Sequence, residues 1–455
     1  MAPLNVLIVG TGEYTTGYVG GGASNSDKSL GVVGLVMFDL RSRGKVDWIG
    51  MVGTTGLKNV GIRQHLTNGI GKKYTGLDTT VELMPADGIA RDVEAYKTAI
   101  DKLKPGDAVI IFTPDDTHFA ISLYAIEHGC HIIVAKPAVK TVEEHRALVE
   151  AAERKGVLAV VELHKRFDPI YADARERIRT LGDFSYYNAY MSQPKFQLQT
   201  FKSWAGKSSD ISYYLNSHHI DMLTWSQQGR AVPISVVASA ASGVAASEEY
   251  GCVDSTEDTI TLMVMFKNIQ SGNFGTALFT SSWIAPKAEV HSQQRFFYMG
   301  HEGEIRVDQA HRGYEAADDD RGFYQNNPLF LRYQPDPLGR YAGQNTYGHI
   351  SFERWVDAVL GVNSGDYSPS DFEASLPTVK STLVVTKILE AGRKSLDQGG
   401  IKIDLEYEIP VAVVAAEVPK KKFIKTVTDT KTTVNDGHGH QKTTHVIRTV
   451  YKPTE

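Results

Sequence analysis

The sequence predicts an α/β protein with two main domains. The first has a doubly wound parallel sheet, and the second, C-terminal domain is α/β with a large, mostly antiparallel open sheet. Over the first 165 residues, short apolar runs alternate with helical patterns, which is typical of parallel βαβ units. A glycine turn closes the first apolar run. Beyond residue 166, β-rich segments follow one another without a regular intervening helix, which favours antiparallel pairing.

The N-terminal elements follow from hydrophobic pattern and helix-end signals. Thr141 and Glu144 have the spacing of a capping box, which predicts that a helix begins there. Basic residues before Gly44 mark the end of another helix. The stretch 20–26 is too rich in glycine and serine to be regular helix throughout. We expect strands at 4–9, 46–52, 107–112, 131–134 and 157–163, and helices at 30–43, 118–128 and 141–155.

The rest of the chain predicts a second sheet and an arm. Segments 190–207 and 295–314 are expected to be loops that shape a pocket. The Thr- and Val-rich tail, which turns at 435–439, predicts a β-hairpin that docks on its own sheet or on a neighbouring subunit. The expected domains are 1–165, 166–410 and 411–455, with strands at 184–190, 234–240, 259–266 and 275–283 and helices at 350–360 and 378–396.

Composition and the lack of certain motifs indicate which partners, compartment and metal the protein is expected to have. The 455 residues include 48 Lys plus Arg and 53 Asp plus Glu, a net charge of −5, which argues against a dedicated nucleic-acid binder. Two cysteines, Cys130 and Cys252, cannot form a disulfide framework, so a reducing compartment is expected. No leader precedes the first apolar run, which is too short to span a membrane, so we expect a cytoplasmic protein. The tail histidines His438, His440 and His445 match no strong metal-ligand spacing, and no metal is predicted.

The turn after the first strand is the first candidate site. Gly10 and Gly12 allow the backbone to turn tightly and to approach a pyrophosphate at a helix N-terminus. Thr15 occupies the usual third glycine position, so the fingerprint of a Rossmann domain is incomplete. An ordinary strand-to-helix turn is the alternative. If a dinucleotide binds here, Glu13 and Tyr14 adjoin it.

The residues after the second strand bear on which dinucleotide binds. An acidic residue there usually holds the ribose of NAD, but Val52 is followed by a segment without a carboxylate. Thr54, Thr55 and Lys58 could instead receive a 2′-phosphate. Asp39 is the competing candidate if the second strand is instead 32–38. The expected cofactor is therefore NAD or NADP, with NADP slightly favoured.

Two further strand ends open on the edge where ligands bind to a parallel sheet. One carries Thr113, Pro114 and His118, and the other carries Lys136 before a proline. A lone lysine at a strand end is usually a solvated residue, but its convergence with the glycine turn favours a role in binding.

Tyr214 and His218 share one face if their segment is helical, and Asp221 lies three residues further on. A phenol, an imidazole and a carboxylate grouped in this way suit proton transfer. The alternative is a polar helix end with one packed histidine.

Five motifs in order give the chain a resemblance to a known family. They are Gly10-Thr11-Gly12, Thr113-Pro114-Asp115-Asp116-Thr117-His118, Ala135-Lys136-Pro137, His164-Lys165-Arg166-Phe167-Asp168-Pro169-Ile170-Tyr171 and Ser217-His218-His219-Ile220-Asp221. Over roughly residues 4–405 the chain resembles the glucose–fructose oxidoreductase, inositol dehydrogenase and MocA (Gfo/Idh/MocA) oxidoreductases. The resemblance implies a Rossmann domain followed by an open-sheet domain, a nicotinamide cofactor, and sugar-like or cyclitol substrates.

The resemblance also implies roles for particular residues. Lys136 falls on the lysine of the family's Glu-Lys-Pro, with Ala135 in place of the glutamate, and His218 falls on the histidine of its His-x-x-Asp. Many members carry an aspartate where this chain has Tyr214. We expect Lys136 to bind cofactor and substrate and to stabilise a developing alkoxide. We expect His218 to accept the proton, with Tyr214 as a third catalytic candidate.

The sequence therefore predicts an NAD(P)-dependent oxidoreductase that takes hydride from a hydroxyl-bearing carbon of a sugar, sugar derivative or cyclitol. Lys165, Arg166 and His219 are further candidates for substrate binding; Lys165 and Arg166 would suit an anionic substrate, although a structural role is favoured for Arg166. The alternatives are a redox-neutral enzyme with a recycled cofactor and a non-catalytic sugar or dinucleotide sensor. A homodimer or higher homo-oligomer is expected, with no nucleic-acid or membrane partner.

Overall fold

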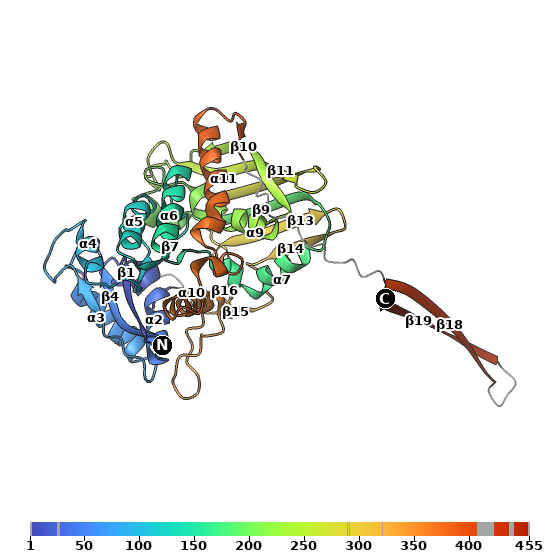
Figure 1. The fold of residues 1–455 in the computed structure, drawn as a ribbon, viewed down its shortest axis with the longest axis horizontal. Helices are drawn as coiled ribbons and strands as arrows, with labels where there is room; N and C mark the ends of the chain where they lie inside the picture. The colour runs from blue at the N-terminus through green and yellow to red at the C-terminus, as the bar shows by residue number, and fades with distance from the viewer. Residues whose placement is uncertain are drawn as a thin grey trace. The chain divides into compact units, whose positions relative to one another are not determined.

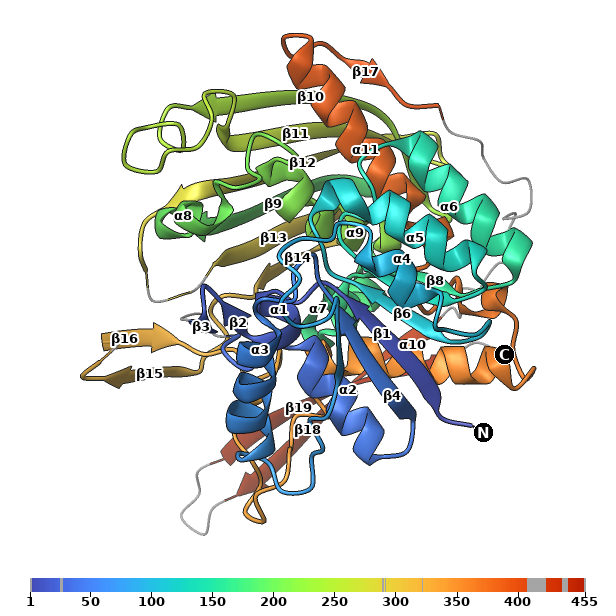
Figure 2. The same ribbon diagram turned by 90° about the vertical axis from the view of Figure 1, so that its left-hand side faces the viewer.

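The computed structural model describes residues 2–24, 28–288, 290, 292–320, 322–406, 423–435 and 441–453. The chain divides into two compact units, residues 1–407 and 408–455. The first unit contains two large sheets, which Figures 1 and 2 show from two sides. Each unit is described by itself below.

The first sheet has six parallel strands in the order β5-β4-β1-β6-β7-β8. This confirms the predicted Rossmann-type sheet. Only the three-residue strand β5 was not expected, because three residues are too few to show a pattern. The strand order reverses between β1 and β6, which is where ligands bind in doubly wound sheets. The bounds are β1 Leu4–Val9, β4 Val46–Val52, β5 Glu82–Met84, β6 Ala108–Ile111, β7 His131–Ala135 and β8 Ala159–Glu162.

Helices cover both faces of this sheet, which explains why its strands are continuously apolar. Helices α2 (Val33–Ser42), α3 (Asn59–Leu66) and α10 (Tyr347–Asn363) share one core with the sheet, which includes Phe38 and Trp355. Helices α4 (Ala95–Ile100), α5 (His118–Glu127) and α6 (Val142–Lys155) form the other core (Figure 2). The predicted cap on α6 is confirmed, since the Thr141 hydroxyl accepts the Glu144 N–H at 3.2 Å. Helix α10 belongs to the predicted second domain by sequence but packs on the first sheet.

The second sheet has seven strands in the order β14-β13-β9-β12-β11-β10-β17. Its pairs are antiparallel except β12 with β9, which confirms the predicted class. The bounds are β9 Phe184–Pro194, β10 Ala231–Ser242, β11 Glu257–Asn268, β12 Phe274–Ala285, β13 Gln293–Gly300, β14 Gly303–Asp308 and β17 Ile403–Asp404.

The expected loops at 190–207 and 295–314 are partly wrong. Residues 190–194 complete strand β9, residues 198–201 form the short helix α8 (Leu198–Phe201), and residues 293–308 contain the hairpin β13–β14. The alternation in β13 is hidden in the sequence, because aromatic residues occupy both faces: Phe296 and Tyr298 are buried while Phe297 between them is partly exposed.

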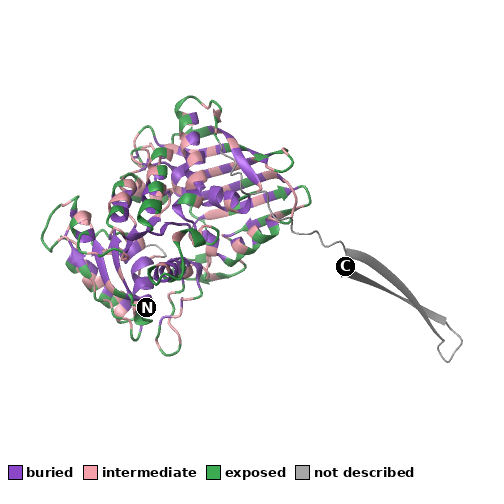
Figure 3. Ribbon diagram, in the orientation of Figure 1, coloured by how far each residue is buried: buried purple, intermediate pink, exposed green. Residues whose placement is uncertain are grey.

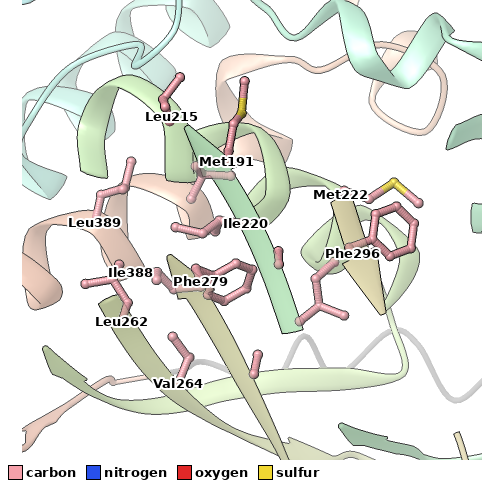
Figure 4. Close-up of a cluster of buried hydrophobic side chains, with 14 of the residues drawn as sticks. Met191, Leu215, Ile220, Met222, Leu262, Val264, Phe279, Phe296, Ile388 and Leu389 are labelled. Atoms are coloured by element: carbon pink, nitrogen blue, oxygen red, sulfur yellow. The ribbon is translucent and has the colours of Figure 1, made fainter. Parts of the chain in front are cut away.

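Helices α7 (Pro169–Ile178), α9 (Ser217–Ser226) and α11 (Val379–Asp397) pack on one face of the second sheet. Figure 4 shows Ile388 and Leu389 of α11 among Leu262 and Phe279 of the sheet. Buried residues follow both sheets and their helices in Figure 3. On the other face of the second sheet, Met263 is exposed.

The second unit contains strands β18 (Phe423–Asn435) and β19 (Gln441–Pro453), paired antiparallel with Asn435 opposite Gln441. The predicted hairpin is confirmed. Its turn at 436–440, with His438 and His440, lies outside the described residues, and the docking of the arm and the homo-oligomer stay predictions. No helix within the described ranges is long and apolar enough to cross a membrane.

Candidate active site

The glycine turn brings two strand ends into close contact. Gly10 has φ +106°, and a Cβ there would lie 2.0 Å from the backbone oxygen of Phe112, just after β6. An L side chain fits neither this conformation nor this space. Gly12 caps the short helix α1 (Glu13–Thr16), and no atom lies within 4 Å of a Cβ built there. This open space beside a backbone turn fits a pyrophosphate, as the two-glycine pattern predicts.

The helix after the turn is interrupted. Helix α1 has four residues, and residues 18–23 form a small hairpin of β2 (Tyr18–Val19) and β3 (Gly22–Ala23) before α2 begins. Val32 N–H donates to the Tyr14 oxygen at 2.8 Å, which links α2 to α1 across the insertion. The close approach usually made at the third glycine is made by Gly34, whose Cβ would lie 2.9 Å from the Thr15 oxygen. The Glu13 carboxylate accepts from the Ser24 hydroxyl, and the Tyr14 ring stacks on Phe112.

The end of β4 carries no carboxylate, as the sequence indicates. The competing Asp39 is excluded because it lies buried inside α2, where His349 Nε2 and Gln344 Nε2 each lie 2.9 Å from its carboxylate. Thr54 is exposed, and Thr55 donates its hydroxyl to the Ile89 oxygen at 3.2 Å. Burial lowers the pKa of Lys58.

The loops after β6 and β7 are held together by His118. Its Nδ1 lies 2.8 Å from the Pro137 oxygen and its Nε2 lies 2.9 Å from the Thr113 oxygen. The ring is fully buried and both nitrogens are occupied by the protein. This corrects the expected direct cofactor contact of His118: the ring instead positions the two loops. Thr113 is half-buried and Pro114 is exposed at the same sheet edge.

Lys136 follows β7 and reaches the segment that precedes α9. Its amine donates to the backbone oxygen of Tyr214 and lies 3.9 Å from the centre of the Tyr214 ring. Burial lowers the pKa of Lys136 to about 8, and the negative charges of Asp115 and Glu162 oppose that shift. An amine with this pKa can exchange a proton near neutral pH.

His218 is the most unusual polar group of the site. It is only 5% exposed, and no hydrogen bond reaches its Nδ1 in the part of the chain that the structure describes. Burial lowers the pKa of His218 well below its usual value, helped by the positive charges of Lys136 and Lys165. The imidazole is therefore neutral at physiological pH.

The structure thus brings Lys136, Tyr214 and His218 together, but not Asp221. Arg166 donates to both Asp221 oxygens, at 2.9 Å from Nε and 2.6 Å from Nη2, and both side chains are buried. The expected group of phenol, imidazole and carboxylate is therefore wrong with respect to its carboxylate, because a buried charge is satisfied by the nearest opposite charge.

The three other predicted substrate residues are placed differently from one another. Lys165 donates to the amide oxygens of Gln294 and Gln309, and burial lowers its pKa to about 7. Arg166 forms the buried ion pair with Asp221, which supports a structural role for Arg166. His219 is buried with Nε2 3.0 Å from the Tyr171 hydroxyl. The expected substrate contact of His219 is corrected, since its ring belongs to the core.

Sequence reasoning missed two residues of this site. Glu162 ends β8, and both of its carboxylate oxygens lie 3.1 Å from Nδ1 of His164. The His164 ring centre lies 5.3 Å from that of His218 and 5.6 Å from that of Tyr347, which comes from α10. The sequence does contain a signal for Glu162, because this carboxylate ends an apolar strand at the sheet edge that carries the glycine turn.

A six-stranded parallel sheet with a glycine turn at its order reversal, followed by a mixed open sheet, defines a two-domain protein of the Rossmann class. Residues 81–163 match a family model described as "Oxidoreductase family, NAD-binding Rossmann fold". Over this segment the chain resembles the Gfo/Idh/MocA oxidoreductases, the family that the ordered motifs indicate. The predicted class of cofactor, a nicotinamide dinucleotide, is the one that this family binds.

Two curated relatives come from Bacillus subtilis (strain 168). The scyllo-inositol 2-dehydrogenase (NAD(+)) is 38% identical over 112 residues, which is 23% of this chain and 33% of the relative. The scyllo-inositol 2-dehydrogenase (NADP(+)) IolW is 30% identical over 118 residues, 25% of this chain and 33% of the relative. The chain thus aligns with about a third of the length of these relatives, and the relatives include both NAD and NADP enzymes.

Solved structures extend the likeness of fold over most of the chain. An inositol dehydrogenase homolog from Azotobacter vinelandii, complexed with NADH and myo-inositol, has a TM-score of 0.59 at 17% identity, covering 89% of this chain and 98% of that one. GenD2 from gentamicin A biosynthesis, in complex with NAD, has a TM-score of 0.60 at 19% identity, covering 90% and 97%. At these identities the likeness concerns the fold alone.

Proposed function

We propose that this chain is an NAD(P)-dependent oxidoreductase that takes a hydride from a hydroxyl-bearing carbon of a sugar, sugar derivative or cyclitol. The observation that carries the proposal is the buried imidazole of His218, whose Nδ1 has no partner in the described chain, near the amine of Lys136. An unsatisfied buried nitrogen costs about 1–3 kcal/mol. A substrate hydroxyl is the partner that would remove this cost.

The residues present suit such a reaction. A bound nicotinamide supplies the hydride acceptor. The backbone at Gly10 and Gly12 would approach the pyrophosphate, and Lys136 would hold the substrate oxygen and stabilise negative charge that develops on it. His218, neutral because of burial and its cationic neighbours, takes the hydroxyl proton as the C–H electron pair leaves as hydride. The substrate carbon then becomes a carbonyl.

NADP is the slightly favoured cofactor. The support is the absence of a carboxylate after β4 and the presence of Thr54, Thr55 and Lys58 there. Lys58 is the cation of this group, and a lysine can bind a phosphate as a point charge.

The test is to mix the protein with NAD or NADP and a panel of cyclitols, sugars and sugar acids, and to follow the absorbance of the reduced nicotinamide. We expect Lys136→Ala to lower kcat by about 10²–10³-fold, the range for removing one charge-stabilising donor. Lys140→Ala is the matched control. Lys140 lies four residues after Lys136 in the same segment, and its amine also donates to a backbone oxygen, that of Ser208.

Two outcomes would count against the proposal. If no substrate yields reduced nucleotide, or if Lys136→Ala performs like Lys140→Ala, the proposed chemistry is wrong. Product formation without accumulation of reduced nucleotide, with the dinucleotide retained by the protein, would instead identify a redox-neutral enzyme with a recycled cofactor.

A further inference from the structure

The site lacks carboxylates at the two positions where the resemblance implies them, Ala135 and Tyr214. The structure supplies one from another strand. Ala135 of β7 and Glu162 of β8 are register partners in the parallel sheet, and partners in register point to the same face. The charge of Glu162 also acts on the amine of Lys136. A carboxylate is therefore present beside the lysine, one strand away from the expected position.

Glu162 is directed at an imidazole. It is 3% exposed, and His164 Nδ1 lies 3.1 Å from each of its oxygens, while the Ser351 hydroxyl lies 3.4 Å away. Among the described residues, no lysine or arginine forms an ion pair with it. The contact fixes the proton of the neutral His164 ring on Nδ1 and leaves a lone pair on Nε2. This is the arrangement in which a buried carboxylate orients a histidine and stabilises its charged form.

His218 has the opposite surroundings. After burial, the largest influences on its pKa come from Lys136, Lys165, His164 and His219, none of which is an anion. His164 faces Glu162, His218 and the phenol of Tyr347. A proton received by His218 is therefore destabilised where it lands, whereas a proton on His164 lies against a carboxylate. The two ring centres are 5.3 Å apart, so the rings are neighbours, and one bridging water would carry the proton between them.

We infer that the Glu162–His164 pair is the terminal acceptor of the substrate's hydroxyl proton, which His218 passes on. This inference rests on the proposed function. The O–H bond breaks and its proton binds His218, the C–H electron pair leaves as hydride to the nicotinamide, and the carbonyl forms. The proton then moves to His164, which Glu162 holds as an imidazolium. The His164 side chain is 15% exposed, so the proton can leave to solvent. Both are positioning residues that act through His218.

The first test needs no substrate. Histidine side chains of the full chain, labelled with ¹⁵N, are observed by NMR at neutral pH, where the ¹⁵N shifts report which ring nitrogen carries the proton. We expect His164 to carry its proton on Nδ1. In Glu162→Gln, which keeps the shape but removes the charge, we expect His164 to lose this preference for Nδ1. Ser351→Ala, which removes a hydroxyl partner of Glu162 but no charge, is the control and should keep the proton of His164 on Nδ1.

The second test uses turnover with the best cyclitol or sugar of the panel. We expect Glu162→Gln to lower kcat at least tenfold with little change in KM. A merely structural role would change kcat and KM together. The inference is overturned if the proton of His164 does not lie on Nδ1 in the wild type, or if Glu162→Gln leaves both that tautomer and kcat unchanged. Absence of any reduced nucleotide with the wild type overturns the proposed function instead.

Discussion

Replacing Lys136 by methionine should lower kcat by about 10²–10³-fold and yet stabilise the fold at neutral pH. Burial lowers the pKa of the Lys136 amine from 10.5 to about 8. Between these two values the unfolded chain binds more protons than the folded chain, so the stability of the wild type rises with pH across that window. Below pH 8 the full cost of the buried charge is present. Methionine has a similar length and carries no charge, so it removes this cost.

The magnitude follows from the shift of the pKa. A difference of 10.5 − 8, or 2.5 units, corresponds to about 3 kcal/mol at ~1.36 kcal/mol per unit. The variant also loses the hydrogen bond to the Tyr214 oxygen, which reduces its gain in stability by about 1 kcal/mol. Loss of the contact with the Tyr214 ring reduces the gain by about 0.5–1 kcal/mol more. We expect Lys136→Met to be about 1–2 kcal/mol more stable at pH 7. At pH 10 the remaining cost of the buried charge is below about 1 kcal/mol, so the variant should be no more stable than the wild type.

The assay is urea unfolding of both proteins at pH 7 and pH 10, with the free energy of the transition that includes the first sheet compared at each pH. Lys140→Met is the control, because the Lys140 amine also donates to a backbone oxygen, that of Ser208. A Lys136→Met variant that is destabilised at pH 7 by the same amount as at pH 10 would refute the reasoning, because the charge would then have no net cost in the folded site.

Three other changes test parts of the fold and the cofactor site. Gly10→Ala places a Cβ 2.0 Å from the Phe112 oxygen at a φ of +106°, so titration with NAD and NADP should show loss of binding even if the chain still folds. Arg166→Met leaves the buried Asp221 carboxylate unpaired and should lower the free energy of unfolding by about 3–5 kcal/mol. The double variant with Asp221→Leu should recover most of this loss. A single variant with unchanged stability would contradict the pairing. Lys58→Ala should raise the Kd for NADP about fivefold to tenfold, as expected for about 1 kcal/mol at a partly exposed phosphate contact, and leave the Kd for NAD unchanged.

Much of the fold is predictable from the sequence because the first sheet is covered on both faces. Its strands are then short apolar runs, and its helices carry their own end signals, as Thr141 shows for α6. The hairpin β13–β14 escaped prediction because aromatic residues such as Phe297 lie on the open face of the second sheet and hide the alternation. The β2–β3 insertion is a short local feature. Nothing in the sequence shows that α2 begins next to α1, with the Val32 N–H donating to the Tyr14 oxygen.

In the candidate site, some residues are predictable from the sequence and others are not. Lys136 and His218 could be found because each stands within a recognisable motif, but the partners of charged groups could not, because they depend on register and on distant contacts. Sequence spacing predicts Asp221 as a partner of His218, yet a better partner, Arg166, comes from 55 residues earlier in the chain. Glu162 takes its place beside the lysine only because β7 and β8 pair with Ala135 opposite it. If function requires a carboxylate near Lys136 rather than at one fixed position, alanine at position 135 is tolerated once the neighbouring strand ends in glutamate. The Glu162→Gln experiment separates that requirement from the packing of the strand, because the variant keeps the register and removes the charge.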